Sequence, residues 1–254
     1  MLVLLPPSEG KASAAKGSAL DLAALSFPAL NPIRERLLRT LVALGSSPDR
    51  AAARAVLGLP PGLDGELDRN AALLTAPAAP AAHVYTGVLY EALGLTTLDR
   101  GARTRANRRV VTVSALWGAV RPGDRIPAYR LSADVRLPGV GGLPAVWRAP
   151  LGAALEKAAG AGLLLDLRST PYAALWRPTG PLAVRTVGVR VVDPATGKVV
   201  SHFNKATKGR LVRALLETKA DPRTERDLVR ALRDLGFAVE PGARPGALDV
   251  AQVV

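Results

Sequence analysis

The stretch MLVLLPPSEGK, residues 1–11, carries the pattern on which the predicted fold rests. Residues 2–5 form a short apolar run of the kind found in buried strands, and the two prolines that follow end it. The run is too short for a signal peptide and has no basic residues before it, so we expect the first strand of a sheet. The loop after this strand carries Ser8, Glu9 and Lys11. It follows a strand as phosphate-binding loops do but lacks the nucleotide P-loop pattern, and an ordinary strand-exit turn is the alternative.

Further apolar runs predict more strands. Val110–Val113 and Leu163–Leu167 are continuous runs typical of buried strands, and residues 237–239 are expected to form a last one. Residues 182–192 alternate as in a long strand, with residues 198–203 as its hairpin partner.

Helices are predicted between these strands from apolar spacing, from prolines at helix starts and from glycines at helix ends. They span residues 31–45, 48–57, 88–94, 150–159, 204–218 and 222–235. Residues 58–82 are rich in Pro, Gly and Ala and are expected to be an irregular excursion or an insertion, and residues 137–146 a loop. Because strands and helices are interspersed, we predict an α/β or mixed α+β class, with one compact domain over residues 1–254 and helices flanking a mixed sheet.

Positive charge is concentrated in the middle of the chain. Residues 101–213 hold 19 Lys and Arg against 5 Asp and Glu, whereas the other 141 residues hold 15 against 16, which together give the net charge of +13. A codon bias towards arginine is visible in 27 Arg against 7 Lys, but such a bias does not explain the scarcity of acids. A basic stretch of this kind is typical of proteins that bind nucleic acid or another phosphate-rich ligand.

The composition also excludes several kinds of site. The chain has no cysteine, which excludes disulfides, thiolate catalysis and zinc ribbons. Two histidines, His83 and His202, are too few for a histidine-rich metal site, so we expect no metal and no cofactor. No apolar stretch is long enough to span a membrane, and we expect a soluble, cytoplasmic protein without membrane partners.

Residues 201–213 carry the clearest local sign of an anion site. The predicted helix within this segment places Lys205 and Lys208 on the same face as its apolar residues, in the first turn. A lysine there meets a buried surface and the partial positive charge of a helix N-terminus, and a bound phosphate would offset both costs. The alternative is an internal ion pair with Glu9 or Asp166.

Three other segments combine arginines with aromatic or acidic residues. Residues 100–109 hold five arginines and predict either a phosphate-tracking patch or a solvated linker. Residues 117–130 interleave Trp117 and Tyr129 with arginines, which suits backbone contact with stacking unless both rings belong to the core. Residues 166–169 end a predicted buried strand, a position typical of ligand-binding groups in α/β sheets, with a strand-end ion pair as the alternative.

These motifs, taken in order along the chain, resemble the YaaA family, the bacterial peroxide-stress proteins. The resemblance runs from end to end and rests on PPSEGK at 6–11, VYTG at 84–87, SALWGAVRP at 114–122, YRL at 129–131, Trp147, DLRS at 166–169 with Tyr172, and SHFNKATKGR at 201–210. It implies a single-domain mixed α/β fold with a positively charged cleft. It also implies a DNA-binding protein with a helix-hairpin-helix-like element that protects against hydrogen peroxide and limits free iron.

We place that element at Leu116–Arg121, with Gly118 in its tight turn. Residues 58–82 and the tail after Gly236 depart from the family pattern. Several lysines of the family are arginine here, so the lysines that remain at positions 11, 205 and 208 point to a need for ammonium groups.

We therefore predict a cytoplasmic DNA-binding protein of the hydrogen peroxide response that contacts the phosphate backbone or the DNA structure rather than base edges, without catalysis. The expected nucleic-acid contacts are Arg121, Arg125, Tyr129, Arg130, Lys205, Lys208, Arg210 and Arg213. An anion pocket is expected at Ser8, Lys11, Lys205 and Lys208. One alternative is an enzyme acting on a nucleotide or another small phosphorylated substrate, in which these lysines bind the anion and Glu9 or Asp166 is the general base. Another is that the basic stretch binds RNA or ribosomes non-specifically. A closed pocket around the lysines favours the enzyme, and an open groove favours DNA.

Overall fold

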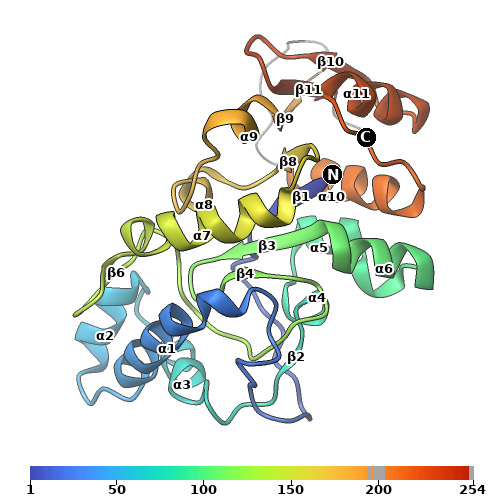
Figure 1. Ribbon diagram of the computed structural model, residues 1–254. Coiled ribbons are helices and arrows are strands. Elements are labelled where there is room, and N and C mark those ends of the chain that lie inside the picture. The colour runs from blue at the N-terminus through green and yellow to red at the C-terminus, as the bar shows by residue number, and fades with distance from the viewer. Residues whose placement is uncertain (194–195, 197–203, 252–254) are drawn as a thin grey trace.

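The computed structural model describes residues 1–193, 196 and 204–251 and places a seven-stranded sheet at the centre of the molecule (Figure 1). The strand order is β10-β11-β9-β8-β1-β3-β4. The strands span Val239–Pro241 (β10), Ala247–Ala251 (β11), Thr186–Val192 (β9), Leu164–Asp166 (β8), Leu2–Leu5 (β1), Val110–Ser114 (β3) and Gly118–Val120 (β4). Two pairs of two-residue strands lie outside this sheet: β2 (Ala79–Pro80) with β5 (Arg125–Ile126), and β6 (Arg136–Leu137) with β7 (Gly141–Gly142).

The five inner strands β3, β1, β8, β9 and β11 are parallel, and the antiparallel strands β4 and β10 complete the two edges. Every residue of β1 is buried, which explains why its sequence is a continuous apolar run rather than an alternating one. The chain passes from β1 to β3 on one side and later returns to β8 on the other side of β1. The winding therefore reverses between β1 and β8, and in such sheets a crevice opens at the carboxyl ends of the strands at this point.

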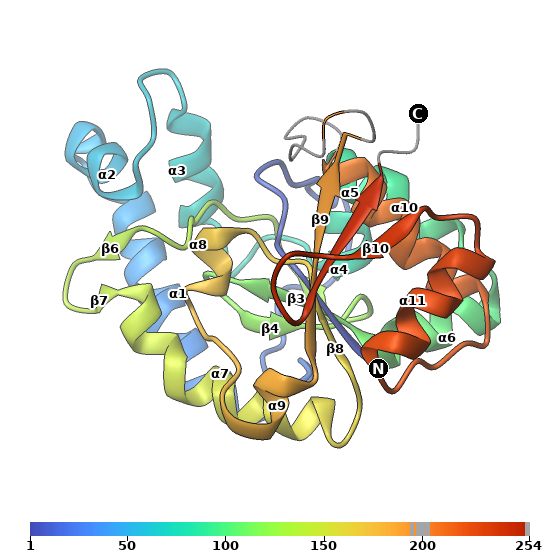
Figure 2. The ribbon, with the colours of Figure 1, turned by 90° about the horizontal axis from the view of Figure 1, so that it is seen from above.

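Helices cover both faces of the sheet. They span Pro28–Leu30 (η1), Asn31–Gly45 (α1), Arg50–Leu57 (α2), Asp64–Ala71 (α3), Ala81–Val84 (α4), Val88–Leu93 (α5), Leu95–Thr97 (η2), Arg100–Arg109 (α6), Leu143–Ala159 (α7), Thr170–Ala173 (α8), Gly180–Val184 (α9), Asn204–Glu217 (α10) and Glu225–Asp234 (α11). Figure 2 shows α7 and α9 on one side of the strands and α5, α6, α10 and α11 on the other, while α1, α2 and α3 pack together at one end. In the part of the chain that the structure describes, no helix combines the length and hydropathy needed to cross a bilayer.

The structure confirms the mixed α/β class and most of the predicted strands and helices, with four corrections. The strand predicted at residues 237–239 is β10, which begins only at Val239, and it is not the last strand because β11 follows it. Residues 182–184 belong to the short helix α9 rather than to β9, because Pro181 stands at the start of a helical turn. Residues 58–82 are not wholly irregular, since they contain α3 and β2. Residues 137–146 are not one loop, since they contain β7 and the first turn of α7. The predicted hairpin strand at 198–203 lies outside the described residues.

The segment Leu116–Arg121 joins two strands and not two helices, so the placement of a helix-hairpin-helix element there is wrong. Residues 115–117 form the tight turn between β3 and β4, and every residue of these strands and of the turn is buried. Gly118 follows the turn with a φ of 68°, a conformation that favours glycine. The ring of Trp147 on α7 packs directly against it, and Trp147 Nε1 donates to the carbonyl of Ala115 at 2.8 Å. Close packing, rather than a nucleic-acid contact, therefore accounts for this glycine.

Replacing Gly118 by alanine is expected to lower the free energy of unfolding by about 2 kcal/mol or more. A residue with a Cβ pays about 1 kcal/mol for the positive φ, and overpacking in a core costs about 1–3 kcal/mol. The added Cβ would lie 2.5 Å from the Trp147 ring. Urea unfolding followed by tryptophan fluorescence measures the change.

The matched control is Gly139→Ala. Gly139 has nearly the same φ, 66°, but nothing lies within 4 Å of the position that its Cβ would take. It reports the backbone strain alone, so it is expected to lose about half as much stability. Equal losses in the two variants would mean that the contact with the Trp147 ring costs nothing.

Candidate anion-binding site

Polar residues gather at the carboxyl ends of β1 and β8, on the edge where the winding of the sheet reverses. The loop with Ser8, Glu9 and Lys11 follows β1, and Asp166 ends β8 in register with Leu4 of β1. Ligands of doubly wound sheets bind at this position, because the loops from the two neighbouring strands leave in opposite directions. This edge is therefore the candidate site.

Hydrogen bonds hold the loop after β1 against the segment that precedes α5. Ser8 Oγ accepts the Thr86 N–H at 3.0 Å and donates to the Gly10 carbonyl at 2.5 Å. Lys11 pairs with Tyr85 in an isolated antiparallel bridge. The Ser8 hydroxyl is thus engaged in shaping the loop that presents Lys11.

Lys11 carries a partly buried ammonium group that its surroundings only partly neutralise. Its Nζ donates to the carbonyls of Ser8 at 2.9 Å and Glu9 at 3.3 Å, and it lies 4.2 Å from the centre of the Tyr129 ring. Burial, followed by the nearby Arg130 guanidinium, lowers the pKa of Lys11 to about 8, although the Glu9 carboxylate acts in the opposite direction. An anion beside Lys11 would therefore stabilise its charged form.

A chain of buried hydroxyl groups lies behind Lys11. The Tyr129 hydroxyl is 2.6 Å from Ser114 Oγ and 3.1 Å from the Tyr85 hydroxyl. Tyr129 is only 1% exposed and packs edge-on against the fully buried Trp117. Both rings are core residues, so the prediction that Tyr129 contacts nucleic acid is wrong for this structure. Burial raises the pKa of Tyr129 to about 12, and the neutral ring supports the Lys11 ammonium through a cation–π contact.

Arg130 and Glu9 form an ion pair beside Lys11. Arg130 Nη2 lies 2.6 Å from Glu9 Oε2, and the Arg130 amide donates to Asn70 Oδ1 at 2.8 Å. The narrow cleft at this point is lined by Ser8, Glu9, Lys11, Arg130, Leu131, Ser132 and Tyr172. The structure thus brings together residues that the sequence assigned separately to an anion pocket and to a nucleic-acid surface.

Asp166 is held by an arginine from its own strand end. Arg168 Nε donates to Asp166 Oδ1 at 2.8 Å and Nη2 donates to Oδ2 at 2.7 Å, a two-pronged pair. The Arg168 guanidinium also donates to the Tyr172 carbonyl at 3.3 Å and lies 5.5 Å from the centre of the Trp176 ring. The strand-end ion pair, which was one of the two alternatives for this segment, is therefore present.

The structure separates the two lysines of α10. Lys208 is half-buried, and burial lowers its pKa, although the carboxylate of Asp166 acts in the opposite direction. Lys205 is exposed, so its predicted inward position is wrong. Gly209 of α10 packs closely against α5, since its Cβ would collide with the Leu89 carbonyl, and Lys205 lies one turn before that contact. Lys208 therefore faces the sheet edge, whereas Lys205 extends into solvent beside it.

Two of the predicted phosphate-binding arginines hold helix ends in this structure. Arg121 Nη1 donates to the carbonyls of Asn107 at 2.8 Å and Arg108 at 2.6 Å, at the end of α6. Arg213 Nη1 donates to the carbonyl of Gly94, just after α5, at 3.1 Å. Arginines in such positions satisfy carbonyls that a helix leaves without partners.

The remaining predicted arginines lie on the surface. Arg125 and Arg210 are exposed, and Arg125 donates to the carbonyl of Ala78 at 2.5 Å. Residues 100–109 form α6, so the alternative of a solvated linker is wrong. Within α6, Arg105 Nε donates to the carbonyl of Leu216 in α10 at 2.6 Å, which fastens the two helices together.

A family model described as peroxide stress protein YaaA matches residues 1–243 of the chain. The chain belongs to the YaaA family. The matched region includes every residue of the candidate site, and the resemblance seen in the motifs is confirmed. The description of the YaaA family connects the chain with peroxide stress.

Curated relatives within this family have names that state no mechanism. A UPF0246 protein of Streptomyces coelicolor is 56% identical and the match covers 98% of each chain. UPF0246 proteins of Corynebacterium efficiens and Corynebacterium glutamicum are 42% and 38% identical, over 94% of this chain and 95% of theirs. The comparisons therefore establish the family and its link with peroxide stress.

Proposed function

We propose that the protein binds DNA in the response to hydrogen peroxide, through phosphate contacts at the carboxyl edge of its sheet. The observation that carries this proposal is two partly buried ammonium groups at the carboxyl ends of adjacent strands: Lys11 in the loop after β1, and Lys208 beside the Asp166 carboxylate that ends β8. In both lysines, burial lowers the pKa more than the neighbouring carboxylates raise it. A phosphate group of DNA beside either lysine would stabilise its charge.

Basic side chains next to the crevice extend the surface on which a polyanion would lie. Arg130 lines the same cleft as Lys11, and the exposed Lys205 lies one turn before Lys208 on α10. Contacts of this kind read the phosphate backbone and make binding depend steeply on salt. Because the rings of Trp117 and Tyr129 are buried, we propose recognition of backbone or DNA structure without base stacking by these two residues.

Replacing Lys208 by glutamine is expected to weaken DNA binding and to reduce the slope of log Kd against log salt concentration by about 1. The change removes one cation from the crevice and leaves a side chain of similar length. Fluorescence-anisotropy titrations with duplex, single-stranded and branched DNA over a salt series measure both quantities. Arg226→Gln is the control, since Arg226 is exposed on α11, outside the basic stretch. If both variants keep the slope of the unmodified protein, Lys208 does not contact phosphate.

The alternative function, catalysis on a small phosphorylated substrate, needs a carboxylate that can accept a proton. Glu9 and Asp166 each already accept from an arginine, at 2.6 Å and 2.7 Å. This arrangement favours binding over acid–base chemistry. Titration with a nucleoside triphosphate under the same conditions is the comparison: a nucleotide that binds more tightly than DNA and is lost in Lys208→Gln would favour the enzyme.

A further inference from the structure

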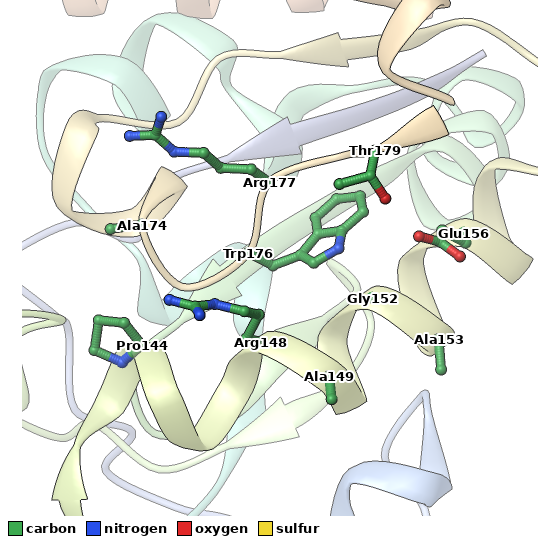
Figure 3. Close-up of a pocket in the computed structure, with 10 residues that line it drawn as sticks. All are labelled: Pro144, Arg148, Ala149, Gly152, Ala153, Glu156, Ala174, Trp176, Arg177 and Thr179. Atoms are coloured by element: carbon green, nitrogen blue, oxygen red, sulfur yellow. The ribbon is translucent and has the colours of Figure 1, made fainter. Parts of the chain in front are cut away.

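A pocket of about 730 Å³ lies between α7 and the segment that follows α8 (Figure 3), and neither Lys11 nor Lys208 lines it. Its volume is in the range of pockets that bind small molecules. It is lined by Pro144, Arg148, Ala149, Gly152, Ala153, Glu156, Ala174, Trp176, Arg177 and Thr179. Of these residues only Trp176 touches the candidate site described above, because the Arg168 guanidinium lies 5.5 Å from the centre of its ring.

Two arginines at this pocket are available for a ligand. Arg148 and Arg177 are both exposed, and neither donates to another residue in the described part of the chain. Figure 3 shows both guanidinium groups on the same side of the Trp176 ring. This differs from Arg168 and Arg213, whose guanidinium groups are tied to protein oxygens. Two unpaired guanidinium groups on one side of a pocket are suited to an oxyanion with several acceptor oxygens, such as a phosphate ester.

Trp176 forms the wall between these arginines and the rest of the pocket. It is 4% exposed, and its Nε1 donates to no acceptor among the described residues. A Cβ at Gly152 would lie 3.0 Å from Nε1, so the lack of a side chain at Gly152 lets α7 pack closely against this edge of the indole. The indole N–H therefore lies against α7 at the wall of the pocket, and it donates to no acceptor among the described residues.

The opposite side of the pocket carries a negative charge. Glu156 on α7 is exposed, and Figure 3 shows its carboxylate across the Trp176 ring from the two guanidinium groups. A carboxylate accepts hydrogen bonds from hydroxyl groups but repels a second phosphate. The pocket thus has one side that carries positive charge and another that accepts hydrogen bonds. This arrangement matches a ligand with a phosphate at one end and hydroxyl groups at the other.

We propose that this pocket binds a phosphorylated sugar or a nucleoside monophosphate, with the phosphate between Arg148 and Arg177 and the sugar hydroxyl groups at Glu156. The pocket is a second ligand site, independent of the DNA surface proposed at the sheet edge.

Calorimetric titration with ribose 5-phosphate tests the proposal on the full chain. The double variant Arg148→Gln/Arg177→Gln is expected to lose affinity at least tenfold, whereas Lys157→Gln is expected to bind as the unmodified protein does. Lys157 is exposed on the same helix and does not line the pocket. Glu156→Gln is expected to weaken the binding of ribose 5-phosphate but not the binding of inorganic phosphate. Thermal unfolding checks that each variant is folded. We expect no loss of fold, because the replaced side chains are exposed.

Two results would overturn the proposal. One is the absence of saturable binding of ribose 5-phosphate at millimolar concentration in the unmodified protein. The other is that the two arginines matter for a DNA duplex and not for ribose 5-phosphate, which would assign their charge to the DNA backbone. Lys208→Gln distinguishes the two sites, because it is expected to weaken the binding of DNA and to leave the binding of ribose 5-phosphate unchanged.

Discussion

Replacing Arg34 by methionine is expected to lower the free energy of unfolding by about 3 kcal/mol or more. Arg34 lies on α1, is wholly buried, and donates to the carbonyls of Trp117 at 2.9 Å and Ala119 at 2.7 Å. It also donates to the Ser26 carbonyl at 2.9 Å and to Asn31 Oδ1 at 2.8 Å. Methionine fills much of the same space without a donor, so the buried carbonyls of Trp117 and Ala119 would lose the Arg34 donor, and the Trp117 carbonyl would keep the Ala119 N–H at 2.9 Å.

Urea unfolding measures this loss, and Arg39→Met on the solvent side of the same helix is the matched control. The Arg39 change is expected to alter stability by less than about 0.5 kcal/mol, because that side chain is largely exposed. The Arg34 variant is also expected to bind DNA more weakly, since the hairpin carries Ser114, whose hydroxyl positions Tyr129 beneath Lys11. If the two variants unfold at the same urea concentration, Arg34 does not hold the hairpin.

The burial of Arg34 could not be predicted from the sequence, although the helix that carries it could. The apolar spacing predicted α1 with its buried face, and Arg34 stands one turn before Leu37 and Leu38 on that face. Charged residues are rarely buried without partners, but the partners here lie 83 and 85 residues away on another element. The elements of this fold were predictable because apolar runs and spacing are local. The contacts that fasten them are not local, and they include the Trp147 ring that makes Gly118 necessary.

The candidate site was predictable to a similar extent. Asp166 and the loop with Lys11 were expected at strand ends, and parallel strands bring such ends to one edge. The tyrosine hydroxyls behind Lys11 had no sequence signal, since Tyr85 and Tyr129 are 44 positions apart. The prediction that Lys205 points inward was wrong for a physical reason. Helical spacing gives the direction of a side chain, but it does not show how far along the helix a neighbouring element covers it.

Replacing Lys11 by methionine is expected to stabilise the folded protein and to remove part of its dependence on pH. The pKa of Lys11 is about 8 in the folded protein, against the ordinary value of 10.5 in the unfolded chain. Between these values the unfolded chain holds a proton that the folded chain has lost, so the free energy of unfolding rises with pH from about 8 to 10.5. That rise is expected to be missing in the variant. At pH 7 the full cost of burying the charge remains, and the variant is expected to be more stable by about 1 kcal/mol or more.

The same variant is expected to bind DNA at least tenfold more weakly at pH 7, a loss of about 1.4 kcal/mol, because a desolvated contact between ammonium and phosphate is gone. Lys11→Arg is the companion variant, since a guanidinium keeps its charge across the range. Anisotropy titrations at pH 7 and pH 9 are expected to show weaker binding at pH 9 for the unmodified protein and little change for the arginine variant.

A methionine variant that gains stability and still binds DNA as well as the unmodified protein would refute the role of Lys11 in binding. An arginine variant that weakens equally at pH 9 would assign the pH dependence to another group. We expect the variant to gain stability and to lose DNA binding. A buried ammonium group that lowers the stability of the fold is retained where its charge binds a ligand. That combination would tie the crevice between β1 and β8 to DNA more firmly than a loss of binding alone, which a damaged fold also produces.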